Sequence, residues 1–261
     1  MTRYSLFIAS ALTSAFLFTQ AYADTTDETS KSGELPKAEI EGIIKDYIMK
    51  HPEVMQESFN KMQQRDQAKR METMKKGAVK YKDELLGGEN TPSAGDASTA
   101  TVTITEFYDF HCGYCKQMVP TITKVLDEDK HVRVVFKDLP ILSPDSELAA
   151  KASIAFYSLN KAHYFEFYTE LMKATGHFDE QLLQETAAKF GVKGDALKDA
   201  MNLPEVAEAV AKNKELAKNL SVTGTPALFI GTEVMGGAAS YDQLKNAIQK
   251  IREKKASGHN S

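Results

Sequence analysis

The apolar positions of the first part of the chain follow a helical repeat. Between residues 35 and 86 apolar residues recur at three- and four-residue steps, which predicts two helices with a break at Pro52. Asp66 and Lys69 interrupt the apolar stripe of the second helix, and Gly77 weakens that helix further. The apolar positions are Ile40, Ile43, Ile44, Tyr47 and Ile48, then Met55, Phe59 and Met62, and last Met71, Met74, Ala78, Tyr81 and Leu85.

Strand patterns and helical patterns alternate in the rest of the chain. Residues 102–110 and 132–137 are rich in β-branched and aromatic residues, which predicts two strands, and a helical pattern lies between them. Four helical segments follow, at 146–159, 162–175, 180–190 and 204–220. Two further strands at 227–230 and 233–235 and a helix at about 241–254 end the pattern. This order predicts an α/β domain over residues 101–255 with a helical insertion at about 144–220.

The N-terminus has the pattern of a secretory signal peptide. Arg3 precedes an apolar run at 6–18, and Ala21 to Ala23 supply small residues at a cleavage site. The run is too short to span a bilayer, so we expect cleavage after Ala23 and not a retained anchor. Residues 24–34 are polar and expected to be disordered. Residues 87–100 have the composition of a linker.

The striped helices over 35–86 need a partner surface, because an apolar stripe is buried in a stable protein. That surface is either the main domain or a second copy of the chain. A flexible linker loosens the tie to the main domain, which favours a homodimer or homotrimer assembled through residues 35–86. The same region carries many lysines and arginines, which we interpret as a solvated face and not as a site for an anionic partner.

The composition narrows the chemistry. A formal net charge of −4 gives no reason to expect nucleic acid as a partner. The chain has two cysteines, Cys112 and Cys115, and two cysteines placed at random would have this spacing about one time in 100. A structural disulfide would close too short a loop to stabilise much. A zinc site would need ligands that no second Cys or His pair supplies, so we expect no metal and no cofactor.

Cys112 and Cys115, in the motif CGYC, have the arrangement that disulfide exchange requires. The predicted strand ends at Phe110 and a helix begins at Cys112, where unpaired backbone N–H groups favour the thiolate form of a sulfur. We therefore predict that Cys112 is the nucleophile. Cys115, one turn deeper, would be the resolving thiol. Gly113 and Tyr114 between them would set the local geometry and the redox potential.

The order of these elements, with CGYC and the later VTGTPALFIG, resembles the thioredoxin-like disulfide proteins of the DsbA and DsbC group over about residues 101–254. The resemblance implies a thioredoxin fold with an inserted helical domain. It also implies that Thr225–Pro226 is a cis-proline loop facing the sulfurs, where the backbone of Thr225 would pair with an extended substrate.

The resemblance also places an acidic residue in the strand before CGYC, where Glu106 lies. A buried Glu106 would relay the proton of Cys115; the alternative is an outward-facing strand residue. Lys137 would either pair with Glu106 or, as we prefer, be exposed. A cationic His111 would favour the Cys112 thiolate; otherwise it is a polar residue at a strand end.

The helical N-terminal segment is similar to that of oligomeric DsbA-type proteins, including the suppressor-of-copper-sensitivity C type. CGYC and the threonine before Pro226 resemble DsbC, whereas the helical block resembles DsbA. We therefore expect a periplasmic or envelope-associated disulfide isomerase or reductase, with some oxidase activity. Its partners would be exported proteins with cysteines and a membrane redox partner. A dedicated oxidase, and an oligomeric holdase chaperone or surface-associated binding protein with incidental thiols, are the alternatives.

Overall fold

A computed structural model of the 261-residue chain describes residues 35–258, in two compact units divided between Phe59 and Asn60. The predicted signal peptide at 1–23 and the predicted disordered segment at 24–34 lie outside the described residues. Within 35–258, no helix is both long enough and apolar enough to cross a membrane.

The first unit contains helix α1 (Lys37–Lys50) and the beginning of α2 (Pro52–Lys80). Proline suits the first position of α2, because no helical partner is lost there. None of the residues described in this unit, 35–59, is buried, and the apolar stripe expected from the sequence lies exposed on them. Its exposed apolar residues include Ile40, Ile43, Ile44, Tyr47, Met55 and Phe59.

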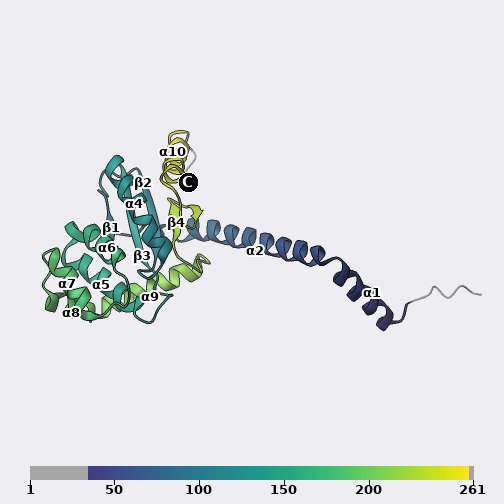
Figure 1. The fold of residues 1–261 in the computed structure, drawn as a ribbon. Coiled ribbons are helices and arrows are strands. Elements are labelled where there is room, and N and C mark those ends of the chain that lie inside the picture. The colour runs from purple at the N-terminus through teal and green to yellow at the C-terminus, as the bar shows by residue number, and fades with distance from the viewer. Residues whose placement is uncertain (1–34, 259–261) are drawn as a thin grey trace, which may run out of the picture. The chain divides into compact units, whose positions relative to one another are not determined.

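A five-stranded mixed sheet forms the centre of the second unit (Figure 1). Its order is β1 (Ser93–Ala94), β3 (Val132–Asp138), β2 (Val102–Tyr108), β4 (Ala227–Ile230) and β5 (Glu233–Gly236). β2 and β3 are parallel, and the other neighbours are antiparallel. The central strands are almost wholly buried, which explains their continuous apolar character.

Helices cover both faces of this sheet. Helix α4 (Gly113–Glu128) connects β2 to β3, and α10 (Tyr241–Ala256) follows β5. The predicted helical insertion between β3 and β4 is confirmed. It contains α5 (Ser146–Leu159), the 3-10 turn η1 (Lys161–His163), α6 (Tyr164–Lys173), α7 (Glu180–Lys189), α8 (Gly194–Met201) and α9 (Pro204–Asn219). Helix α8 was not predicted.

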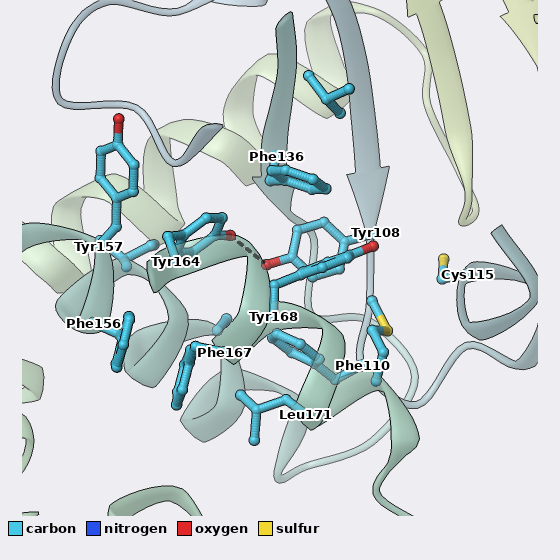
Figure 2. Close-up of a cluster of buried hydrophobic side chains, with 14 of the residues drawn as sticks. Tyr108, Phe110, Cys115, Phe136, Phe156, Tyr157, Tyr164, Phe167, Tyr168 and Leu171 are labelled. Atoms are coloured by element: carbon cyan, nitrogen blue, oxygen red, sulfur yellow. Dashed lines mark hydrogen bonds between the residues drawn. The ribbon is translucent and has the colours of Figure 1, made fainter. Parts of the chain in front are cut away.

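One face of the sheet packs against the insertion through a dense aromatic cluster (Figure 2). Tyr108 of β2 and Phe136 of β3 meet Tyr164 and Tyr168 of α6, with ring centroids 4.4 Å apart for Phe136 and Tyr168. Edge-on contacts between rings add to the stability gained by burying them. The helical insertion is therefore fixed to the strand that leads into CGYC.

The end of α2 and helix α3 (Lys82–Leu86) pack on the opposite face of the sheet. Met74, Ala78 and Leu85 are buried there against Phe107 and Phe229. The prediction that the whole of 35–86 is available for a partner chain is therefore wrong for its last third. The apolar positions on the two sides of the interruption at Asp66 and Lys69 therefore have different surroundings.

The predicted linker at 87–100 is also partly wrong. Ser93 and Ala94 form the edge strand β1, and the Phe136 N–H donates to the Pro92 carbonyl at 2.8 Å. Thr105 donates its hydroxyl proton to the Leu85 carbonyl at 2.9 Å. This segment is tied to the sheet and belongs to the second unit.

Candidate active site

The two cysteines lie where β2 gives way to α4. Cys112 is the N-cap of α4, in an extended conformation, and Cys115 lies in its first turn. The Cys112 N–H donates to the Asp109 carbonyl at 2.9 Å, and the Cys112 carbonyl accepts from the Lys116 N–H at 3.0 Å. Cys112 is 6 % exposed and Cys115 is 0 % exposed, and both are free thiols. The predicted order of an outer and a deeper sulfur is therefore present.

Asp109, which the sequence analysis missed, holds the turn between β2 and α4. Its Oδ1 accepts from the His111 N–H and the Ser146 hydroxyl, each at 2.9 Å. Its Oδ2 accepts from the N–H groups of Ile141 and Leu142, at 2.8 and 3.0 Å. A buried carboxylate with four donors ties the cysteine turn to the chain after β3. An aspartate just after a strand, before a cap, is the only signal of this role in the sequence.

The Thr225–Pro226 peptide bond is cis, as the resemblance implied. The Cys112 thiol donates to the Thr225 carbonyl, with 3.2 Å between sulfur and oxygen. The loop before β4 and the first turn of α4, which are more than a hundred residues apart, are thus brought together. Tyr114 is 64 % exposed and Gly113 has open space beside it, so the surface next to Cys112 is accessible to a large molecule.

Glu106 is 0 % exposed, which excludes the outward-facing alternative. The Tyr168 hydroxyl donates to Glu106 Oε2 at 3.2 Å, and the buried Oε1 has no hydrogen-bond partner. Burial raises the pKa of Glu106 to about 8, so this carboxyl is largely protonated at neutral pH. Burial, and next the charge of Glu106, also raise the pKa of Cys115.

The half-buried His111 side chain contacts an acidic residue. Its Nε2 lies 2.9 Å from Asp145 Oδ1, and its ring stands edge-on to Phe178 with centroids 4.9 Å apart. A hydrogen bond from Ser143 holds the pKa of Asp145 well below its usual range, and the Phe178 N–H also donates to Asp145. His111 therefore links the cysteine turn to the start of the helical insertion.

The expectation for Lys137 is wrong, because this lysine is 7 % exposed and does not pair with Glu106. In the parallel register Glu106 lies opposite Phe136, and Lys137 lies opposite Phe107, so the two side chains point to opposite faces of the sheet. Lys137 lines a cavity of about 410 Å³ on the face covered by α3 and α9. Burial, with Arg133 nearby, lowers the pKa of Lys137 to about 8.

Residues 103–249 match the family model described as a DSBA-like thioredoxin domain. The chain belongs to the DSBA-like thioredoxin family. Residues 37–69 match a second model, the N-terminal domain of the copper resistance protein ScsC. A DSBA-like domain with two neighbouring cysteines, here Cys112 and Cys115, is a thiol–disulfide oxidoreductase, and so is this chain.

Three proteins illustrate the similarity. A probable disulfide bond formation protein D of Bacillus anthracis is 28 % identical over 168 residues, which are 59 % of this chain and 76 % of the relative. The thiol–disulfide exchange protein alpha-DsbA2 of Wolbachia pipientis has a TM-score of 0.64 and 27 % identity, covering 70 % of this chain and 97 % of that protein. A linker-deletion variant of Proteus mirabilis ScsC covers 85 % of this chain and 99 % of its own, with a TM-score of 0.64 and 22 % identity, which supports the fold alone.

Proposed function

We propose that this protein is a periplasmic disulfide isomerase and reductase for exported proteins, with Cys112 as the attacking sulfur. The supporting observation is the position of Cys112 at the start of α4, 3.2 Å from the Thr225 carbonyl, with the buried Cys115 one turn away. The N–H groups of the first helical turn favour a negative sulfur. The half-buried Thr225 lies beside Cys112, and its backbone would pair with a substrate segment as a neighbouring strand does.

The reaction has two outcomes after one common step. The Cys112 thiolate attacks a substrate disulfide, forms a mixed disulfide, and releases the other substrate sulfur as a thiolate that takes up a proton. In isomerisation, a different substrate thiolate attacks the mixed disulfide and restores Cys112. In reduction, Cys115 loses its proton and attacks Cys112. The substrate leaves as a thiol and the enzyme keeps a Cys112–Cys115 disulfide, which a membrane redox partner then reduces.

In our proposal Glu106 assists the second outcome. Its pKa of about 8 lies close to ambient pH, so it exchanges a proton more readily than an exposed carboxyl does. Only the ionised form of Glu106 can accept a proton; in that form Tyr168 occupies Oε2, and Oε1 has no hydrogen-bond partner. We assign to Glu106 the transfer of the Cys115 proton, and to His111 and Asp145 the support of the turn that carries Cys112.

We further propose that the protein assembles as a homodimer or homotrimer through the apolar stripe at 35–62. The stripe is exposed on α1 and the first part of α2, whereas Met74, Ala78 and Leu85 are already buried in the second unit. The match to the ScsC N-terminal domain at 37–69 covers this stripe. The domain layout we propose is a signal peptide at 1–23, a disordered segment at 24–34, an assembly segment at 35–62, and a catalytic domain that includes α3 and β1.

The experiment compares refolding of a scrambled multi-disulfide protein by the mature chain and by an Ile43→Glu, Tyr47→Glu variant. The two glutamates would disrupt the stripe without touching the catalytic domain, and Lys45→Glu is the control for added negative charge on the same helix. We expect the variant to lose both its oligomeric mass and its isomerase activity while it still oxidises thiols. An oligomeric protein that never isomerises would refute the isomerase proposal.

A dedicated oxidase is the second candidate, because the Bacillus relatives are named disulfide bond formation proteins. The reduction potential of the Cys112–Cys115 pair separates the two candidates. A strongly oxidising potential near that of DsbA, about −120 mV, would favour the oxidase, and a value near −180 mV or lower would favour the isomerase.

A further inference from the structure

A groove of about 600 Å³ lies between α2 and the cis-proline loop. Gln63, Gln67 and Arg70 of α2 form one wall, and Gly224, Pro226 and Gly237 lie on the other side. All of these residues belong to the second unit. The groove therefore joins the helix that leads out of the first unit to the loop that faces Cys112.

The α2 wall is held firmly in place. Met74 is buried in the core one turn beyond Arg70, and Gly77 approaches the end of α9 so closely that an added Cβ would lie 3.0 Å from Leu220 Cδ2. The Arg70 guanidinium donates to the Thr223 hydroxyl at 2.9 Å. Thr223 lies only two residues before the carbonyl that contacts Cys112, so the wall and the cis-proline loop are directly connected.

The opposite side of the groove is open to a polypeptide backbone. Gly224 and Gly236 have no heavy atom within 4 Å of an added Cβ, and the nearest atom to Gly237 is the Pro226 carbonyl oxygen at 3.9 Å. No side chain from these three positions blocks an extended chain. A substrate cysteine held at Thr225 would bring its flanking residues into this groove.

The chemistry of the α2 wall suits an unfolded polypeptide segment. The amides of Gln63 and Gln67 both donate and accept hydrogen bonds, as main-chain peptide groups require. Met71 and Met74 line the groove, and the flexible methionine side chain adapts to apolar groups of different shape. Asp66 and Arg70 carry opposite charges, so the groove has no strong preference for either sign.

We propose that α2 is part of the substrate site: Gln63, Gln67 and Arg70 bind the extended polypeptide segment that flanks the cysteine attacked by Cys112. The inference rests on the proposed exchange reaction and adds its substrate class, an unfolded segment with an apolar side chain near the cysteine. It assigns to α2 a second role besides assembly. The same helix would bring subunits together through residues up to 62 and bind substrate through the next two turns.

The test uses the mature full-length protein in its reduced form and two disulfides with the same leaving group. One is an unstructured decapeptide whose central cysteine carries thionitrobenzoate and whose neighbour is leucine. The other is thionitrobenzoate joined to mercaptoethanol. Attack by Cys112 on either compound forms a mixed disulfide and releases coloured thionitrobenzoate. The ratio of the two rate constants therefore measures binding of the peptide flanks.

The Gln63→Ala, Gln67→Ala double variant should lower this ratio about fivefold, because two hydrogen bonds to the peptide are lost. Gln64→Ala, on the same helix but outside the groove, should leave the ratio at its native value. A circular dichroism spectrum like that of the native protein confirms that α2 is intact. An unchanged ratio in the folded double variant overturns the inference, and an accompanying change in solution mass would show that another copy of the chain occupies the groove.

A second variant tests the same inference by adding a charge to the groove. The measured quantity is the ratio of the rate constants for two decapeptides, one with lysine and one with glutamate two residues from the cysteine. This ratio should be about threefold higher for Gln67→Glu than for the native protein, because the added carboxylate attracts the lysine. Equal selectivity in both proteins would overturn the inference. A native protein that releases no thionitrobenzoate from either compound would instead overturn the proposed exchange reaction, so the two failures are distinguishable.

Discussion

Replacing Glu106 by glutamine should stabilise the protein at neutral pH. Glutamine has the shape of the protonated carboxyl and still accepts the Tyr168 hydrogen bond, but it cannot ionise. The native carboxyl must either stay protonated or become a buried anion, because it is 0 % exposed and its Oε1 has no hydrogen-bond partner. The substitution removes this cost and keeps the packing.

The magnitude follows from the pKa of Glu106 in the two states. The pKa is about 8 in the folded protein, against a reference value of 4.5 for the unfolded chain. Below pH 4.5 both states hold the proton, and Glu106 does not affect stability. Between pH 4.5 and 8 the unfolded state releases a proton that the folded state keeps, so rising pH favours unfolding by about 1.4 kcal/mol per pH unit. The native protein therefore loses about 3 kcal/mol by pH 7 and about 5 kcal/mol above pH 8.

The assay is urea unfolding of the reduced native and Glu106→Gln proteins, followed by circular dichroism at pH 4.5, 6, 7 and 8.5. The difference between the two free energies of unfolding isolates Glu106, because Asp138, whose pKa burial also raises to about 8, titrates in both proteins. Glu205→Gln, an exposed position on α9, is the control and should change stability by less than about 1 kcal/mol at every pH. A difference that stays flat from pH 4.5 to 8.5 would refute the reasoning.

Three further predictions follow from other contacts. Tyr168→Phe removes the hydrogen bond that lowers the pKa of Glu106. In single-turnover kinetics the pH midpoint for attack of Cys115 on the mixed disulfide should therefore rise by about one half to one pH unit. An unmoved midpoint would contradict this prediction. Lys137→Met should stabilise the protein by about 3 kcal/mol at pH 7, because protonating Lys137 is less favourable in the folded protein than in the unfolded chain. The gain in the free energy of unfolding should vanish near pH 10.5, which is the opposite pH trend to that of Glu106→Gln. Gly77→Val should cost about 2 kcal/mol in urea unfolding because its side chain would collide with Leu220, whereas Gly42→Ala, with open space around it, should show no such loss.

The regular elements of the catalytic domain were predictable because their apolar periodicity is strong. The strands β2, β3 and β4 and the helices α5, α7 and α9 lie within one or two residues of the predicted ranges. Helix α8 was missed because it has only eight residues and begins at Gly194, and β1 because a two-residue strand has no periodicity. Short elements depend on tertiary contacts that a local pattern does not contain.

The burial of polar residues was not predictable from the pattern. Glu106 and Lys137 both occur in strand patterns, and only the register between β2 and β3 shows that each is buried and that they point to opposite faces. Likewise, an apolar stripe looks the same whether it is covered by its own domain or by another chain. The different surroundings of Ile44 and Met74 therefore became visible only in the structure.

The end of α2 also affects how related proteins can be recombined. The ScsC-like match stops at residue 69 and the DSBA-like match starts at 103, yet the stretch between them supplies Met74, Ala78 and Leu85 to the core. A chimera joined at the apparent boundary near residue 86 would lose the lining of one sheet face and expose Phe107 and Phe229. Grafting a different assembly module onto this enzyme therefore requires a junction before residue 70. This junction lies inside the continuous helix α2, so the helical repeat of the new module must be in phase with that of α2.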